Sequence, residues 1–136
     1  MEQQDHLRRQ IEQLGRVLGK ILSDLVGLKQ KGQVNQGIEI TDRALKNELD
    51  LDTVELMAIP TDNFITTLKN TKGFNNENLD KLADILLVIA NNEENKNENR
   101  NMLYEKCLTI YQYLEKSEPI YSFDRHLKME RIKNLL

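Results

Sequence analysis

Residues 7–28 read LRRQIEQLGRVLGKILSDLVGL, and this stretch decides the fold class. Its apolar side chains recur at alternating intervals of four and three residues: Leu7, Ile11, Leu14, Leu18, Ile21, Leu25 and Leu28. Such a seven-residue repeat places all its members on one side of an α-helix. Periodic helices longer than about 25 residues are typical of coiled coils and helical repeats. The pattern therefore predicts a long N-terminal helix within residues 1–31, with its regular part from Gln3 to Gln30.

The rest of the chain also carries helical signals, and no stretch of four or more residues alternates as a strand does. A second helix is expected over 34–49. Further helix boundaries are expected at a cap on Asp52, an end before Pro60, a stop at Gly73, a cap on Asn76, an end before Pro119 and a cap on Ser122. The last helix is expected to face inward with Phe123, Leu127, Ile132 and Leu135.

Residues 91–101 contain six asparagines and no apolar side chain. A segment of this composition buries no area to offset its ordering entropy, so we expect a solvated loop there. The predicted fold class is all-α: stacked antiparallel helical hairpins with a long N-terminal helix, in a single domain over residues 1–136.

Composition and charge exclude several classes of protein. The longest apolar run covers residues 85–90, far short of the roughly 20 residues that a membrane span needs. The first ten residues, MEQQDHLRRQ, hold no apolar signal region, and the single cysteine forms no internal disulfide. We therefore expect a cytoplasmic protein without a membrane span.

The distribution of charge argues against nucleic acid as a partner. The formal net charge is −3, and it divides into +2 for residues 1–31, −6 for residues 32–117 and +1 for residues 118–136. A duplex-binding protein needs a basic face that releases counterions from phosphates. Most of this chain would repel phosphate instead.

Residues 32–45, GQVNQGIEITDRAL, resemble the second helix of a tetratricopeptide repeat. In that comparison Gly37 and Ala44 are the small residues at the point where two helices cross closely. A looser match runs from Leu82 to Leu108, and the usual period of about 34 residues is broken. The whole chain is similar to small bacterial tetratricopeptide-like proteins of unassigned function. The resemblance implies stacked hairpins and an interaction module, and it names no ligand.

The long first helix raises the question of what covers its apolar side. A second helix of 16 residues spans roughly 24 Å, against about 42 Å for the first. Either the C-terminal helices fold back over the remainder, or a second copy of the chain covers it about a two-fold axis. The candidates for self-association are Leu7, Ile11, Leu14, Gly15, Leu18 and Gly19. A separate candidate for contact with a partner is Tyr113.

Candidates for catalysis and metal binding have simpler structural interpretations. Asp50 and Asp52 imitate the aspartate pair of a phosphatase motif, but a helix precedes them, so Asp52 is expected to cap a helix. Cys107 is expected to be a small buried residue, since no histidine lies near it in sequence. His6 and His126 lack partners at metal-binding spacing. We predict no catalytic residue, cofactor or metal.

The expected function is therefore a non-enzymatic helical-repeat module that binds another protein, whose identity the sequence does not give. The alternative is a structural module that oligomerises, for instance as a homodimer, through the N-terminal heptads. A remoter alternative is an enzyme whose site is not recognisable from the sequence.

Overall fold

The computed structural model describes the backbone of the chain except for residues 1, 33 and 93–97. Within that part the chain forms seven helices and no strand. The helices are α1 (Glu2–Gln30), α2 (Val34–Leu49), α3 (Thr53–Ala58), α4 (Thr61–Thr71), α5 (Asn76–Asn91), α6 (Glu98–Ser117) and α7 (Phe123–Leu135). The predictions of an all-helical chain and of a long N-terminal helix are confirmed.

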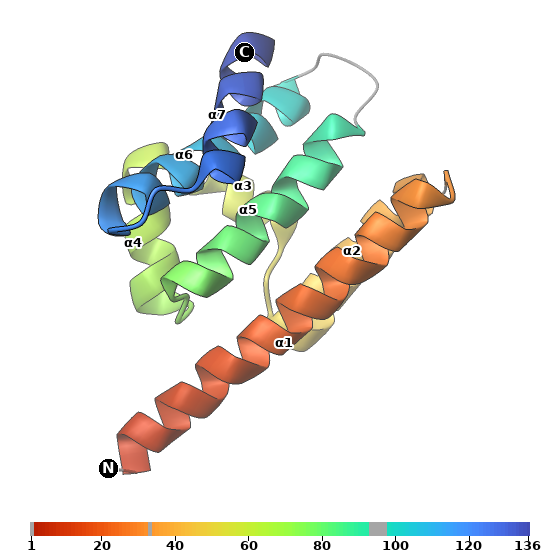
Figure 1. Cartoon of the computed structure of the whole chain (residues 1–136). Helices are drawn as coiled ribbons and strands as arrows, with labels where there is room; N and C mark the ends of the chain where they lie inside the picture. Colours follow the sequence, from red (N-terminus) through yellow and green to blue (C-terminus); the bar gives the residue numbers. More distant parts are fainter. Residues whose placement is uncertain (1, 33, 93–97) are drawn as a thin grey trace.

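Two pairs of consecutive helices form the body of the fold. Helices α1 and α2 run in opposite directions beside each other, and α5 and α6 form the second pair (Figure 1). Helix α1 also packs along α5, so the first helices of the two pairs meet at the centre of the molecule. Helices α3, α4 and α7 pack against α6. The apolar side of α1 is thus covered from two directions, by α2 and by α5.

The helix ends at α3 follow from local chemistry. Asp52 has extended backbone and its carboxylate accepts a hydrogen bond from the Val54 N–H at 2.9 Å, which is the predicted cap. Ile59 is extended because the ring of Pro60 disfavours helical geometry in the preceding residue. Helix α3 therefore ends at Ala58, as predicted.

The boundary between α4 and α5 is set by a glycine and an asparagine. Gly73 adopts a φ of +72°, and the N–H of Phe74 returns to the Leu68 carbonyl at 3.1 Å, which closes the end of α4. The prediction at Gly73 is confirmed. The cap of α5 is Asn75, one residue before the predicted Asn76, since it is the Asn75 side chain that accepts from a backbone N–H of the first turn.

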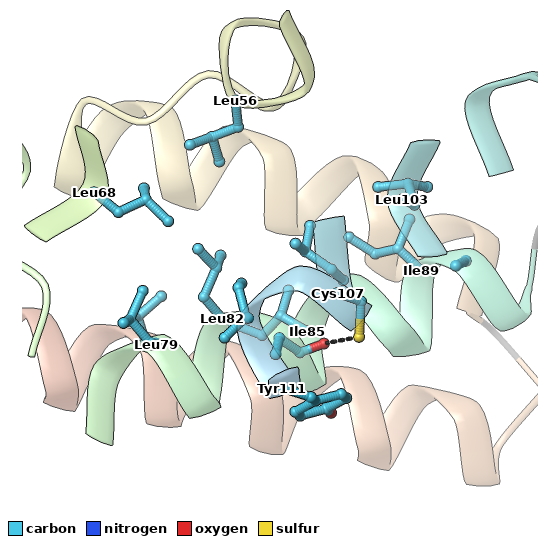
Figure 2. Packing of buried hydrophobic residues seen from close by; sticks show 14 of the residues in the cluster. Leu56, Leu68, Leu79, Leu82, Ile85, Ile89, Leu103, Cys107 and Tyr111 are labelled. Atoms are coloured by element: carbon cyan, nitrogen blue, oxygen red, sulfur yellow. Dashed lines mark hydrogen bonds between the residues drawn. The ribbon is translucent and has the colours of Figure 1, made fainter. Parts of the chain in front are cut away.

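The core lies where α5 packs between α1 and α6. Figure 2 shows Ile85 of α5 beside Cys107 of α6, with Leu82 and Tyr111 nearby in the same cluster. These four side chains are fully buried. No helix in the part of the chain that the structure describes is long and apolar enough to cross a membrane.

The inward face of α7 differs from the prediction. Met129 and Ile132 are buried, and with them Arg125, whereas Phe123 is 65% exposed and Leu127 and Leu135 are each 44% exposed. The apolar residues of α7 lie on two opposite sides of the helix, so their pattern does not fix which side turns inward. The side that carries Arg125 turns inward because the carboxylates of Asp80 and Glu118 pair with it there.

The asparagine-rich segment is less open than expected. Helix α5 continues to Asn91, and α6 begins at Glu98, so residues 98–101 are helical rather than part of a loop. Asn91 accepts a hydrogen bond from the Tyr104 hydroxyl at 2.8 Å, and the Asn92 amide donates to the Val88 carbonyl at 2.7 Å. The Asn92 side chain thus satisfies a carbonyl at the end of α5, and the Asn91 side chain joins α5 to α6. Residues 93–97 of the expected loop lie outside the described residues.

Candidate functional site

The N-terminal half of α1 presents an apolar ridge, which we define as Leu7 and Ile11. Leu7 is 55% exposed and Ile11 is half-buried. Figure 1 shows the first turns of α1 projecting past the end of α2. The ridge is therefore the N-terminal part of the α1 stripe, and neither α2 nor α5 covers it completely.

An open cleft borders the ridge on each side. The first, the α1–α5 cleft, has a volume of about 760 Å³ and is lined by the ridge with Arg8, Glu12 and Arg16 of α1 and with Glu77 and Lys81 of α5. The second, the α1–α4 cleft, has a volume of about 680 Å³ and extends from α1 to the end of α2 and the turn after α4. Volumes of this size fall within the range of ligand-binding clefts.

Two hydrogen bonds fix the floor of the α1–α5 cleft. The buried Asn78 donates from Nδ2 to the Ile11 carbonyl at 3.1 Å, and Lys81 donates from Nζ to the Gly15 carbonyl at 3.3 Å. A Cβ atom on Gly15 would stand 2.9 Å from Oδ1 of Asn78, closer than real contacts allow. Gly15 therefore permits the close approach of α5. The sequence carries no signal for the role of Asn78, because the bond joins residues 67 positions apart.

The structure places the residues proposed for self-association in different surroundings. Leu14 is 7% exposed and Leu18 is fully buried, while Gly15 packs against α5 of the same chain. A Cβ on Gly19 would meet nothing within 4 Å. The cover of Leu14, Gly15 and Leu18 is therefore intramolecular, one of the two alternatives above. Of the six residues, the ridge residues Leu7 and Ile11 and the half-buried Gly19 stay accessible to another molecule.

The other candidates for contact are Ala44, Gly37 and Tyr113. Ala44 is half-buried and packs against the core from α2. The surroundings of Gly37 lie outside the described residues. Tyr113, the candidate for contact with a partner, is half-buried: Lys69 donates from Nζ to its hydroxyl oxygen at 2.5 Å and lies 4.9 Å from its ring centroid. Tyr113 joins α6 to α4, because its ring and hydroxyl both attract the ammonium group.

The chemistry-bearing residues do not converge on the clefts. Cys107 is fully buried, its Sγ donates to the Ala83 carbonyl at 3.2 Å, and burial raises the pKa of its thiol. His6 is exposed on α1, and His126 of α7 has its Nδ1 4.0 Å from Glu115. Among the residues that the structure describes, no three His, Cys, Asp or Glu side chains are grouped so as to hold a metal ion.

A cluster of charged side chains that the sequence analysis missed joins α5, α6 and α7. Asp84 of α5 accepts at Oδ1 from the Tyr111 hydroxyl at 2.5 Å and from Lys128 Nζ at 3.1 Å. Lys128 also lies 3.0 Å from Asp124 Oδ2. Burial raises the pKa of the Tyr111 hydroxyl, so this group stays protonated and donates.

The second part of this cluster surrounds Arg125 of α7. Its guanidinium contacts Glu118 at 3.3 Å and Asp80 at 3.7 Å. Burial raises the pKa of Asp80, the charge of Asp84 adds to that shift, and Arg125 opposes it. The cluster thus fixes the orientation of α7. One signal was available in the sequence, since Asp80 and Asp84 lie four residues apart and therefore on the same side of the predicted helix.

Comparison of the chain with protein-family models, with curated proteins and with solved structures finds no match.

Proposed function

We propose that this protein is a non-enzymatic helical module that binds another protein through the ridge on α1 and the two clefts beside it. The observation that carries the proposal is the position of Leu7, which is 55% exposed between open clefts of about 760 and 680 Å³. A projecting apolar side chain flanked by depressions offers a partner a shape to match, and protein–protein contacts depend on such complementarity. The proposal places the module in the cytoplasm, in keeping with its single thiol.

Two further observations support an interaction role. The buried, protonated Cys107 is unsuited to nucleophilic attack, and the charged cluster around Arg125 serves to dock α7. The two helical pairs, α1 with α2 and α5 with α6, favour a tetratricopeptide-like arrangement, in which α3 and α4 would be an insertion.

A homodimer formed through α1 is the second candidate. The exposure of Leu7 favours it, because the same residue on two copies would meet about a two-fold axis. The burial of Leu14 and Leu18 counts against it, since these residues were to supply most of the contact.

Site-specific photo-crosslinking in the native host tests the proposal. A photoreactive amino acid replaces Gln10, which is exposed and lines the α1–α4 cleft, and in a control it replaces Gln112, which is exposed on α6. We expect a discrete adduct from residue 10, which the additional change Leu7→Asp abolishes, and none from residue 112. An adduct of two copies of the 15.9 kDa chain would favour the homodimer. Equal labelling from both residues, or none from residue 10, would contradict the proposal.

A further inference from the structure

The α1–α5 cleft carries charges that identify the kind of partner. Arg8 and Arg16 of α1 are exposed, and no described carboxylate lies within 4.0 Å of either guanidinium. They are eight residues apart, or about 12 Å along the helix. The chain as a whole has a net charge of −3, whereas residues 1–31, which include both arginines, carry +2.

The opposite wall of the cleft adds positive potential. Lys81 lies on the floor, where it donates to the Gly15 carbonyl and is 3.9 Å from Glu77 Oε1. The cap residue Asn75 also lines the cleft, so the N-terminus of the 16-residue α5 opens towards it. The positive end of a helix favours negative charge nearby. The described lining residues hold three cations and two carboxylates, the second carboxylate being Glu12.

We propose that the partner segment is an amphipathic helix that places an apolar side chain on the ridge and carboxylates opposite Arg8 and Arg16. This inference rests on the proposed function and adds the chemistry of the partner. Along α1 the signs run positive, negative, positive at four-residue intervals, through Arg8, Glu12 and Arg16. A partner helix with carboxylates two turns apart, and a neutral or basic residue between them, matches that order.

The same carboxylates make a polyanion a poor fit. Phosphates follow one another continuously along a nucleic acid, and the headgroups of an anionic membrane are similarly dense. Glu12 lies between the two arginines and Glu77 faces them, so such a surface would meet repulsion at each of these groups. A partner helix with discrete carboxylates avoids repulsion from both Glu12 and Glu77.

Selection from a display library tests this inference with the full chain. The library presents helical segments of about 16 residues with apolar residues fixed at helical spacing and with flanking positions varied among Glu, Lys, Gln and Ala. We expect enrichment of Glu at two positions seven or eight residues apart. Binding of the enriched peptides, measured by fluorescence anisotropy, should weaken at least about tenfold in the Arg8→Glu/Arg16→Glu variant and between about 0.05 and 0.3 M salt.

A matched variant controls for net charge. Arg43→Glu/Arg131→Glu makes the same change at two exposed arginines outside the cleft, and its peptide affinity should stay within about twofold of the parent. Circular dichroism establishes that both variants are folded.

The outcomes separate the two proposals. Peptides that need Leu7 but carry Lys or Gln flanks, or that ignore the Arg8→Glu/Arg16→Glu change, overturn the inference about charge and leave the ridge as a binding surface. No enrichment, or binding unaffected by Leu7→Asp, overturns both. A short DNA duplex or anionic vesicles that bind in an Arg8- and Arg16-dependent manner would also overturn the inference.

Discussion

Arg125 of α7 donates from both terminal nitrogens to a single oxygen, Oε2 of Glu118, at 3.3 Å each. Glu118 directly follows α6, so this contact ties α7 back to the helix before it. Arg125 is only 8% exposed, and its Nε is buried without a hydrogen-bond acceptor in the part of the chain that the structure describes. The guanidinium therefore depends strongly on Glu118, because a buried charge without a partner is costly.

Removing the charge of Glu118 should loosen α7. We expect Glu118→Gln to lower the free energy of unfolding by about 1–2 kcal/mol at pH 7, since hydrogen bonds to charged groups contribute about 1.5–3 kcal/mol and Glu118 keeps some contact with water. Urea unfolding followed by circular dichroism measures the change. The control Glu130→Gln removes an exposed pair with Lys133 and should cost less than about 0.5 kcal/mol. Equal effects would contradict the role of Glu118.

Neutralising Asp80 should raise the free energy of unfolding at pH 7, whereas neutralising Glu118 should lower it. Burial raises the pKa of Asp80 above its ordinary 3.8. The stability linked to this group is therefore fully present below pH 3.8 and is lost as the pH rises through the folded-state pKa. We expect Asp80→Asn to be more stable than the parent at pH 7, with the difference vanishing below pH 3.8, as measured by unfolding at a series of pH values. A less stable variant at pH 7 would show that attraction to Arg125 outweighs burial.

Two of the three glycines in α1, Gly15 and Gly19, should respond differently to alanine. In Gly15→Ala the new Cβ would stand 2.9 Å from Oδ1 of Asn78, whose side chain is held by its bond to Ile11, so we expect a loss of about 1–2 kcal/mol. In Gly19→Ala the Cβ meets nothing within 4 Å. The higher helix propensity of alanine should therefore raise the free energy of unfolding by about 0.5–1 kcal/mol. Thermal unfolding of both variants measures the difference. If both substitutions changed the stability in the same direction, the close approach of α5 at Gly15 would be disproved.

The isolated protein should be a monomer. The accessible apolar side chains of the ridge are Leu7 and the half-buried Ile11, which fall well short of the roughly 800 Å² per partner that a stable interface buries. Sedimentation equilibrium should give the 15.9 kDa of one chain. A dimer that Leu7→Glu dissociates would favour self-association instead.

Local signals in the sequence predicted most of the secondary structure. The bounds of α2 match the prediction, and Asp52, Pro60 and Gly73 act where the sequence placed them. Each of these effects is decided within a few residues of the chain, by a cap, a restricted backbone or a left-handed φ. The long repeat in α1 likewise needs no information from elsewhere in the chain.

The candidate site was predicted only in part, because it depends on contacts between distant segments. The ridge residues Leu7 and Ile11 were named, but the sequence grouped them with Leu14 and Leu18, which the fold buries. The inward side of α7 was misjudged because a buried Arg125 is favoured only by the carboxylates of Asp80 and Glu118, which the fold brings to it. Amphipathic periodicity shows that a helix has a face that packs inward. In α7, the ion pairs with distant carboxylates determine which face this is.

The contact between α1 and α5 also has a consequence for synthesis. The bond from Asn78 to Ile11 spans 67 positions of the chain. Because a ribosome adds about 5–20 residues per second, about 3 to 13 seconds pass between the synthesis of these two residues. During that interval the side of α1 around Gly15 lacks the helix that packs against it in the finished protein. The newly made chain therefore exposes to solvent, and to nascent-chain chaperones, a surface of α1 that is later buried against α5.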